Sequence, residues 1–280
     1  MTQPAAELQR SQGELRVRLR KLSHRTVLGD LYQQGCLKAR IPRRSSERPL
    51  EVVTINTAGG LTDGDELRTS IEWDAGTRGV VTTQAAERVY HCRQDPALIN
   101  TTLVISDNAI AGWLPQETIL FDSSRLERRT NVELGENAKF FAVESLVFGR
   151  IAMQETVQSG QLFDRLQIRQ DDRLVFADAL ALGGDEQSPV QEHLAKDSVL
   201  GNARCCATIV FAGNTDTELP DMLRTAIADS HAVGGASDLG SVITMRLLAA
   251  DSRTLRELIL RLYTICLEPF EFTEPRVWHC

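Results

Sequence analysis

The sequence predicts a mainly β protein with two α-helices in its C-terminal third. This prediction rests on three observations. Apolar and polar residues alternate with period two over many short segments, and Gly, Asp and Asn separate these segments at regular intervals. After residue 183 the pattern changes, and apolar residues then recur at helical spacing. Many short strands are typical of a sandwich, a barrel or a β-solenoid, and no fixed-period repeat in the sequence decides among them.

The β-rich part is expected over residues 13–182. At its start, Leu15, Val17 and Leu19 alternate with arginines, which predicts a strand with one basic face. Short extended pieces are expected over residues 26–28 and 36–41. Further strands are expected over residues 66–73, 79–83, 98–105, 118–121, 126–134, 139–143, 162–168 and 174–177.

The sequence pattern over residues 205–266 predicts a strand–helix–strand–helix portion that packs on the β body. The strands are expected over 205–211 and 242–250, and the first helix over 219–228. The second helix follows from apolar residues at helical spacing between Leu255 and Cys266. Residues 183–200 are expected to form a loop. Because no linker is evident, residues 1–280 are expected to form a single domain, with residues 1–12 as a flexible extension.

Composition excludes several classes of protein. Lys and Arg number 31 against 38 Asp and Glu, so the formal net charge is −7, which argues against a nucleic-acid binder. The N-terminus carries no basic and apolar export signal, and no apolar run is long enough to span a membrane. The six cysteines are scattered without a CxxC pair. We therefore expect a soluble cytoplasmic protein whose thiols stay reduced.

Several catalytic and ligand-binding motifs are absent from the sequence. It contains no GxxxxGK[ST], GxSxG or HExxH pattern, so the chain alone should neither bind nor hydrolyse GTP through a P-loop. His91-Cys92 and the terminal His279-Cys280 place nitrogen and sulfur ligands side by side. Adjacent strand residues point to opposite faces, so neither pair predicts a strong metal site, and the role of His279-Cys280 stays open.

A loop rich in glycine and acids lies between two strand-like runs, at residues 55–67. Gly59, Gly60 and Gly64 allow sharp turns, and Asp63, Asp65 and Glu66 add three carboxylates. Clustered carboxylates suit a hard or borderline cation. Gly and Asp are also the usual residues of a simple turn, and the residue types alone favour the turn.

Other acids allow more than one interpretation. Glu144 and Asp178 lie inside apolar runs, where burial is unfavourable unless a carboxylate is paired. Pairing with an arginine is one reading, and a polar path for an ion is the other. Glu117 and Asp122 follow the segment Trp113-Leu114-Pro115. They predict, as an alternative function, a β-rich carbohydrate-active hydrolase with these two acids as its acid/base pair.

Several motifs, in the same order and over most of the chain, resemble the UreD (UreH) family of urease accessory proteins. They are Asn56-Thr57-Ala58-Gly59-Gly60, Gly64-Asp65, Thr82-Thr83-Gln84-Ala85-Ala86-Glu87-Arg88-Val89-Tyr90, Trp113-Leu114-Pro115-Gln116-Glu117, Phe121-Asp122, Glu144-Ser145-Leu146-Val147-Phe148-Gly149-Arg150 and Pro275-Arg276-Val277-Trp278. One departure is Asp63, where the family commonly has glycine. The resemblance implies a stacked β-sheet, helix-like (solenoid-like) body with two α-helices.

The resemblance also implies a function. The protein would not be an enzyme. It would act as a scaffold that binds apo-urease subunits and UreF-type and UreG-type accessory proteins, the last being the GTPase. No cofactor would be tightly bound, and nickel would pass in transit through a water-filled tunnel lined by carboxylates. The family acids fall here on Asp65, Glu66, Glu144 and Asp178.

Carboxylates suit such transit, because His or Cys ligands would hold Ni²⁺ too tightly to release it. The tunnel hypothesis requires that the acids are not isolated from one another by arginines. A purely structural scaffold, in which the acids are salt-bridged and nickel crosses elsewhere, is a third interpretation.

Overall fold

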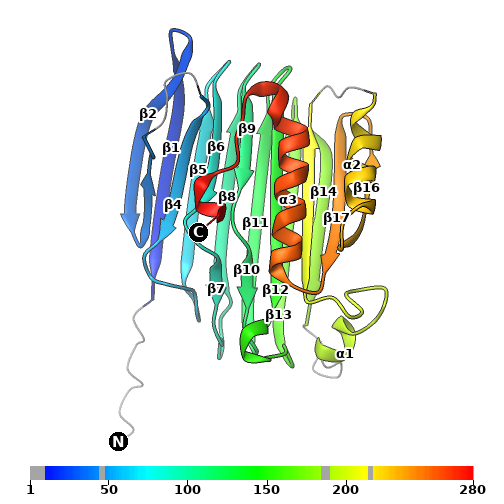
Figure 1. The fold of residues 1–280 in the computed structure, drawn as a ribbon. Helices are drawn as coiled ribbons and strands as arrows, with labels where there is room; N and C mark the ends of the chain where they lie inside the picture. Colours follow the sequence, from blue (N-terminus) through cyan, green and yellow to red (C-terminus); the bar gives the residue numbers. More distant parts are fainter. Residues whose placement is uncertain (1–9, 44–47, 184–189, 214–216, 280) are drawn as a thin grey trace, which may run out of the picture.

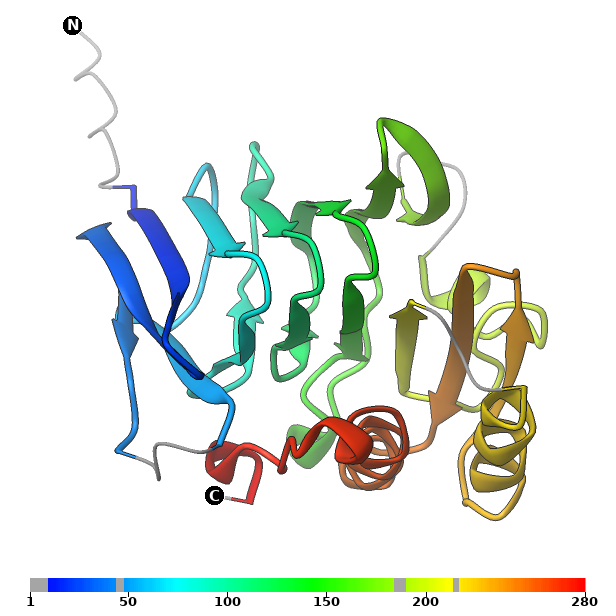
Figure 2. The same ribbon diagram turned by 90° about the horizontal axis from the view of Figure 1, so that it is seen from above.

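The structure is a computed structural model that describes residues 10–43, 48–183, 190–213 and 217–279. Two β-sheets face each other, and helix α3 (Ser252–Leu267) lies along the outer face of the larger sheet (Figures 1 and 2). Apolar residues fill the space between the sheets and the space under α3. The predicted mainly β architecture with helices near the C-terminus is confirmed.

The smaller sheet has seven strands in the order β14-β13-β11-β8-β5-β1-β2. All neighbours between β1 and β13 run parallel, and the two edge strands pair antiparallel. Its strands are β1 (Gln12–Leu22), β2 (Arg25–Gly35), β5 (Glu66–Trp73), β8 (Ala97–Ile105), β11 (Ser124–Leu134), β13 (Gly160–Gln170) and β14 (Arg173–Leu182).

The larger sheet has ten strands, eight of them in the order β16-β17-β15-β12-β9-β6-β4-β3. The two short strands β7 and β10 extend it, since β10 pairs with both β7 and β12. Its strands are β3 (Leu37–Arg40), β4 (Leu50–Asn56), β6 (Arg78–Thr83), β7 (Glu87–Val89), β9 (Ile110–Leu114), β10 (Thr118–Leu120), β12 (Lys139–Phe148), β15 (Cys205–Ala212), β16 (Val233–Asp238) and β17 (Val242–Ala249).

The chain alternates between the two sheets and forms a solenoid. After β4 it enters the smaller sheet at β5, returns at β6, and repeats this passage through β8, β9, β11, β12 and β13. Each passage adds one parallel strand to a sheet, so equivalent positions of successive coils stack in rows. The solenoid-like stacking implied by the family resemblance is therefore confirmed.

The helices are α1 (Val190–Leu194), α2 (Leu219–Ala228) and α3, with short 3₁₀ turns η1 (Ile151–Met153), η2 (Glu268–Phe270) and η3 (Arg276–His279). The two long helices match their predicted ranges. The Asp251 carboxylate caps α3 by accepting a hydrogen bond from the Thr254 amide at 2.8 Å.

Several elements differ from the prediction, and strands β7 and β9 were not predicted. The α1 turn falls within the expected loop 183–200. The glycine-rich, exposed edge strand β16 was missed because it has no alternation of apolar and polar residues. Strand β2 is eleven residues long, because pairing with β1 extends a segment that is polar on both faces.

The N-terminal extension is shorter than expected in its described part, since β1 already begins at Gln12. The Ser11 amide donates to the Asp65 carboxylate at 2.6 Å, which attaches this residue to the body. Residues 1–9 of the expected extension lie outside the described residues.

The C-terminus is fastened to the larger sheet by Trp278 in η3. Its side chain is 3% exposed, and its indole Nε1 donates to the Thr82 hydroxyl at 2.9 Å. The Arg256 guanidinium on α3 lies over the Trp278 ring, 5.5 Å from its centre. These contacts hold the end of the chain against β6 and α3.

Replacing Trp278 with alanine should remove this attachment. Loss of a buried aromatic side chain and its hydrogen bond should lower the free energy of unfolding by about 3–5 kcal/mol. Urea unfolding followed by circular dichroism measures the change. His279→Ala is the matched control, because the His279 side chain is 56% exposed and should matter little. Equal stability of the two variants would contradict the conclusion that Trp278 attaches the C-terminus to the larger sheet.

Candidate functional site

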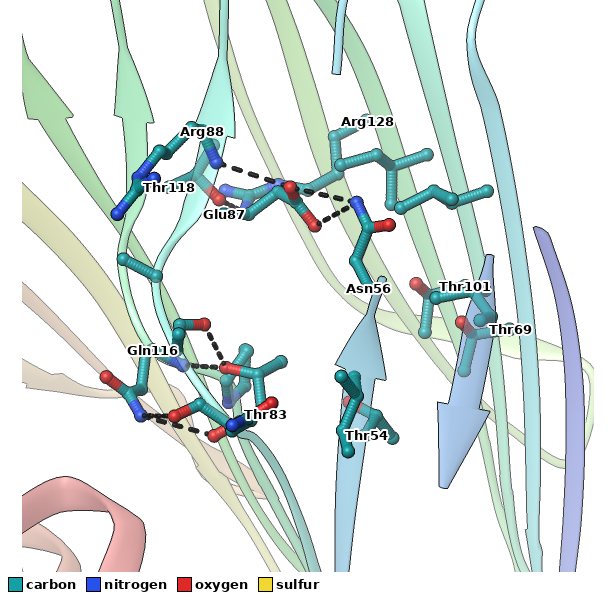
Figure 3. Close-up of a pocket in the computed structure, with 18 of the residues that line it drawn as sticks. Thr54, Asn56, Thr69, Thr83, Glu87, Arg88, Thr101, Gln116, Thr118 and Arg128 are labelled. Carbon is teal, nitrogen blue, oxygen red and sulfur yellow. Dashed lines mark hydrogen bonds between the residues drawn. The ribbon is translucent and has the colours of Figure 1, made fainter. Parts of the chain in front are cut away.

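A cavity of about 210 Å³ lies between the two sheets (Figure 3). The smaller sheet contributes residues of β5, β8 and β11, and the larger sheet contributes residues of β4, β6, β9 and β12 together with the short strands β7 and β10. Its charged lining residues are Glu87, Arg88, Arg128 and Glu144. Among the residues that the structure describes, no histidine or cysteine lines it.

Stacking of the coils explains the polar wall on the smaller sheet. The register aligns Thr69 with Thr101 and Thr101 with Thr130 on successive strands. Each of these residues stands at an inward position, Thr69 and Thr101 between apolar neighbours and Thr130 between Arg128 and Val132, so a row of hydroxyl groups crosses the sheet interior. Thr69 and Thr101 reach the cavity itself.

A buried charge cluster closes one side of the cavity. The Arg128 guanidinium on β11 donates through Nε and Nη2 to the two carboxylate oxygens of Asp164, at 2.8 and 2.5 Å. Its Nη1 atom lies 2.7 Å from an oxygen of Glu144 on the opposite sheet. All three side chains are less than 10% exposed, so Arg128 joins the sheets through a fully desolvated ion pair network.

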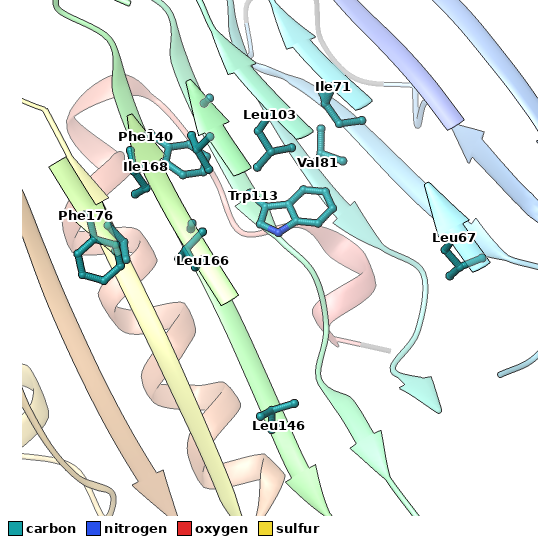
Figure 4. Packing of buried hydrophobic residues seen from close by; sticks show 14 of the residues in the cluster. Leu67, Ile71, Val81, Leu103, Trp113, Phe140, Leu146, Leu166, Ile168 and Phe176 are labelled. Carbon is teal, nitrogen blue, oxygen red and sulfur yellow. The ribbon is translucent and has the colours of Figure 1, made fainter. Parts of the chain in front are cut away.

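Glu144 receives two further hydrogen bonds. The Thr130 hydroxyl donates to its Oε1 atom at 3.0 Å, and the Trp113 indole donates to the same atom at 3.2 Å. Figure 4 shows Trp113 packed among the apolar residues between the sheets, which keeps water away from this side of Glu144. The carboxylate is thus held in one orientation at the cavity wall.

The cluster carries two carboxylates and one guanidinium. Burial raises the pKa of Glu144, the Asp164 charge adds to this rise, and Arg128 opposes it. Burial alone would lower the pKa of Arg128, but the two carboxylates outweigh it and raise that pKa. With all three groups ionised, one negative charge would be in excess at the cavity wall.

Glu87 is the second carboxylate of the cavity. Both of its oxygens accept hydrogen bonds from the Asn56 side-chain amide at 3.1 Å, and one also accepts from the Arg88 backbone amide at 3.2 Å. Burial raises the pKa of Glu87 to about 7, with a smaller rise from the nearby Asp65 charge. Among the described residues, Glu87 forms no ion pair.

The glycine-rich loop closes the cavity next to Glu87. Gly59 and Gly60 have φ angles of +79° and +152°. These angles are energetically unfavourable for a residue that has a Cβ atom. A Cβ atom on Gly60 would lie 2.3 Å from the Tyr90 ring, whose hydroxyl donates to the Gly59 carbonyl at 3.1 Å. Leu61 then pairs with Val89. The two glycines therefore let the loop pack against β7.

The acids of this loop stabilise turns. Asp63 accepts hydrogen bonds from the Arg93 and Gln94 amides at 2.6 and 3.0 Å. Burial raises the pKa of Asp63, but these bonds outweigh it and bring the pKa below its ordinary value. Asp65 accepts hydrogen bonds from the backbone amides of Ser11 and Thr62. The interpretation of this segment as a turn fits these contacts.

The four predicted path residues do not line one cavity together. Glu144 lines the inter-sheet cavity, while Glu66 lies in a surface groove and accepts a hydrogen bond from Arg68 at 2.7 Å. Asp178 pairs with Arg246 at 2.7 Å and accepts a hydrogen bond from Thr208 at 3.1 Å. Asp65 lies close enough to Glu87 to raise its pKa.

Glu117 and Asp122 both form structural contacts. The Arg256 guanidinium donates to both oxygens of Glu117, at 3.0 and 2.9 Å. Asp122 accepts hydrogen bonds from the backbone amides of Gln158 and Ser159, at 2.7 and 3.0 Å. These contacts give neither acid the environment of a general acid, so nothing in the geometry favours the glycosidase alternative.

The described part of the chain holds no group of three or more His, Cys, Asp or Glu side chains arranged to bind a metal. Its five cysteines are free. His279 pairs with Glu274 at 2.9 Å, and Cys280 lies outside the described residues. None of the described helices has the length and apolar character needed to cross a membrane.

Comparison with known proteins agrees with this architecture. The profile of the family described as UreD urease accessory protein matches residues 11–279. The chain belongs to the UreD family. It is 40% identical to the urease accessory protein UreD of Rhizobium leguminosarum bv. trifolii, over 97% of this chain and 96% of the relative. It is also 40% identical to that of Chelativorans sp., over 98% and 95%.

The UreD motifs now have structural roles. The segment at Trp113–Glu117 links three parts of the fold, because the Gln116 side-chain amide donates to the Thr83 and Gln84 carbonyls and to that of Val277. The Gln116 side-chain oxygen in turn accepts a hydrogen bond from Arg256 at 3.1 Å. The motif therefore ties β6, α3 and the C-terminus together beside the cavity.

The predictions from the sequence did not single out Arg128 and Asp164 as site residues. They also gave Glu87 no role of its own. Arg128 shares the inward face of β11 with Leu126 and Thr130, so the period-two pattern carried a signal for it. Asp164 stands between Leu162 and Leu166 in the same manner. Glu87 was noticed only as part of a family motif, because nothing nearby in the sequence indicates that it is buried.

Replacing Glu87 with glutamine should change the pH dependence of stability. The folded pKa of about 7 exceeds the ordinary value of 4.5, so the folded state binds an extra proton between these values. Wild-type stability should therefore fall as pH rises from about 4.5 to 7 and stay level above it. At pH 8 Glu87→Gln should be more stable than the wild type by up to about 3 kcal/mol, a gain absent near pH 4.5.

Urea unfolding at pH 5, 6, 7 and 8 measures this effect. Glu257→Gln is the matched control, because Glu257 is 66% exposed and pairs only with an exposed arginine. Parallel pH profiles for the wild type and Glu87→Gln would refute the assignment of a raised pKa.

Replacing Arg128 with methionine should strongly destabilise the fold. The substitution leaves Glu144 and Asp164 buried without a cation, which should lower the free energy of unfolding by about 3–5 kcal/mol at pH 8. Glu144→Gln is the comparison, because Arg128 then keeps Asp164 and the loss should be smaller. Similar stabilities of the two variants in thermal and urea unfolding would mean that Arg128 does not hold the sheets together.

Proposed function

We propose that this protein binds apo-urease and helps to deliver nickel into its active site, and that UreF-type and UreG-type partners assemble with it, the UreG-type GTPase supplying GTP hydrolysis. Membership of the UreD family supports a role in urease maturation. Nickel is the cargo of this process and is not a resident cofactor. The protein itself acts as a scaffold and not as an enzyme.

One observation carries the nickel part of the proposal, namely that Glu87 and Glu144 face the same cavity while no histidine or cysteine of the described part of the chain lines it. A dication needs negative charge to enter a protein interior. Carboxylates with water supply it and still release the ion, whereas imidazole and thiolate ligands would bind Ni²⁺ more tightly.

The remaining lining suits a hydrated ion. Hydroxyl groups of five threonines and the amides of Asn56 and Gln116 surround the cavity, and they can bond to water in the ion's shell. The excess carboxylate of the Arg128 cluster adds favourable potential at the wall. These groups would lower the free-energy cost of moving the ion through the cavity without binding it tightly.

The proposed route uses the four acids of the family pattern in different ways. Asp65, next to Glu87, would add negative potential at one end, and Glu144 would contact the ion inside the cavity. Asp178 is partly exposed and lies across from Arg246 on the opposite sheet. Glu66, which lies in the surface groove, would add negative potential outside the cavity. Passage beyond Glu144 would require the Asp178–Arg246 pair to open.

A structural scaffold with ion-paired acids is the second candidate. The pairs Glu144–Arg128 and Asp178–Arg246 favour it, because each carboxylate already has a cation partner. The two candidates agree on the partners. They differ in whether loss of carboxylate charge changes nickel loading.

Urease matured with Glu144→Gln, Glu87→Gln or Asp178→Asn should contain less nickel. Loss of one carboxylate weakens attraction for the dication, and we expect nickel content after a fixed time to fall at least about twofold. Co-purification with apo-urease and the accessory partners should be unchanged. Metal analysis by mass spectrometry and urease activity provide the two readings.

Glu257→Gln is again the matched carboxylate control. Normal nickel content with all three variants would refute the carboxylate route and leave the scaffold candidate. Failure of the wild-type chain to co-purify with apo-urease would refute both candidates.

A further inference from the structure

A second hollow lies outside the inter-sheet cavity, at the ends of β7, β10 and β12. It measures about 560 Å³, and we call it the Arg88 groove. The residues that define it here are Arg88, Tyr90, Phe121, Arg150, Ile151 and Met153. Four of them belong to the family motifs of the sequence. Arg88 also lines the inter-sheet cavity, and Tyr90 also bonds to the glycine loop.

The floor of the groove is a rigid aromatic surface. The Tyr90 and Phe121 rings meet edge to face, with centres 5.0 Å apart. The Arg150 guanidinium lies over the Phe121 ring at 4.7 Å. Glu155 holds Arg150 there by accepting two hydrogen bonds, at 3.0 and 2.9 Å. The charge of Arg150 is therefore already compensated.

Apolar side chains are exposed at the rim. Met153 in the η1 turn is 69% exposed, and Tyr90 is 36% exposed. Methionine side chains adapt to varied partners and are common at protein-binding surfaces. Exposed apolar residues around a hollow are typical of a surface that another protein covers.

Arg88 adds a positive charge that is exposed to solvent, although it lies close enough to Glu87 to lower the pKa of that carboxylate. Its side chain is exposed, and it forms no ion pair and no side-chain hydrogen bond with any described residue. Figure 3 shows it directed away from Asn56, on the side of β7 opposite to the Glu87–Asn56 contact. The whole chain has a formal net charge of −7, so this exposed arginine is a local positive charge on an acidic protein.

We propose that the Arg88 groove docks a segment of the urease apoprotein in which a carboxylate lies next to an apolar side chain. The carboxylate pairs with Arg88, and the apolar side chain packs on Phe121, Tyr90 and Met153. Urease is the occupant because it is the protein that the family description names. The inference rests on the proposed function and identifies the Arg88 groove as the surface that binds urease.

The position of the groove fits this role. Arg88 lines both the groove and the inter-sheet cavity, so a protein bound in the groove lies directly beside the carboxylates of the cavity.

Binding of nickel-free urease to the purified full chain tests the proposal, with affinity measured by biolayer interferometry at several NaCl concentrations. Arg88→Glu and, independently, Met153→Asp should each weaken binding by about tenfold or more, since each removes one half of the recognition. Arg88→Glu should also reduce the dependence of the affinity on NaCl concentration. Arg88→Lys should keep most of the wild-type affinity.

Two matched controls lie outside the groove. Arg173→Glu makes the same charge change at an exposed arginine of β14, and Met222→Asp makes the same change at a methionine of α2 that is 51% exposed. Both should bind within about twofold of the wild type. Thermal unfolding checks that all variants are folded.

Three outcomes would overturn the proposal. Wild-type affinity in both groove variants would exclude the groove, and an equal loss in the controls would show a nonspecific charge effect. A wild-type dimer in light scattering that Arg88→Glu converts to a monomer would assign the groove to a second copy of the chain. Absence of any wild-type binding would instead refute the proposed function on which this inference rests.

Discussion

Arg128 places a guanidinium group between two β-sheets, where an uncompensated charge would cost several kcal/mol. Asp164 on the same sheet and Glu144 on the opposite sheet compensate it, so the sheets are joined by a buried ion-pair network beside the apolar core. A second cross-sheet pair, Asp178 with Arg246, lies further along the fold. With both carboxylates ionised, the two acids that share one arginine would leave one negative charge in excess at the cavity wall. Stability and the polar interior of the protein therefore depend on the same few side chains.

The solenoid explains why polar residues gather in rows. Each coil repeats the register of the previous one, so Arg128 stands directly beside Asp164, and Thr101 stands between Thr69 and Thr130. Polar side chains on neighbouring coils can then satisfy one another's hydrogen bonds without solvent. The same stacking leaves space at the coil ends, where the glycine loop and β7 close the cavity. The UreD motifs lie largely at these closing positions.

Much of the fold was predictable from residues alone. Period-two alternation indicated most strands of both sheets, and helical spacing indicated α2 and α3. The burial of Glu144 was also predictable, since a carboxylate within an apolar run has few other places to lie, whereas Asp178 is only partly buried. Strand β16 and the full length of β2 were not predictable, because exposed edge strands need no apolar face and take their conformation from the neighbouring strand.

The sequence by itself determined that this is a strand-rich UreD-type chain with isolated acids in apolar surroundings. Only the tertiary structure decided which of these acids meet. Arg128 and Asp164 are 36 residues apart and Asp178 and Arg246 are 68 apart, and their contact depends on how coils stack and sheets face each other. It likewise decided that Glu87 shares a cavity with Glu144, whereas Asp65 binds backbone amides. Burial and pairing are properties of packed neighbours, and local residue patterns do not specify neighbours so distant in sequence.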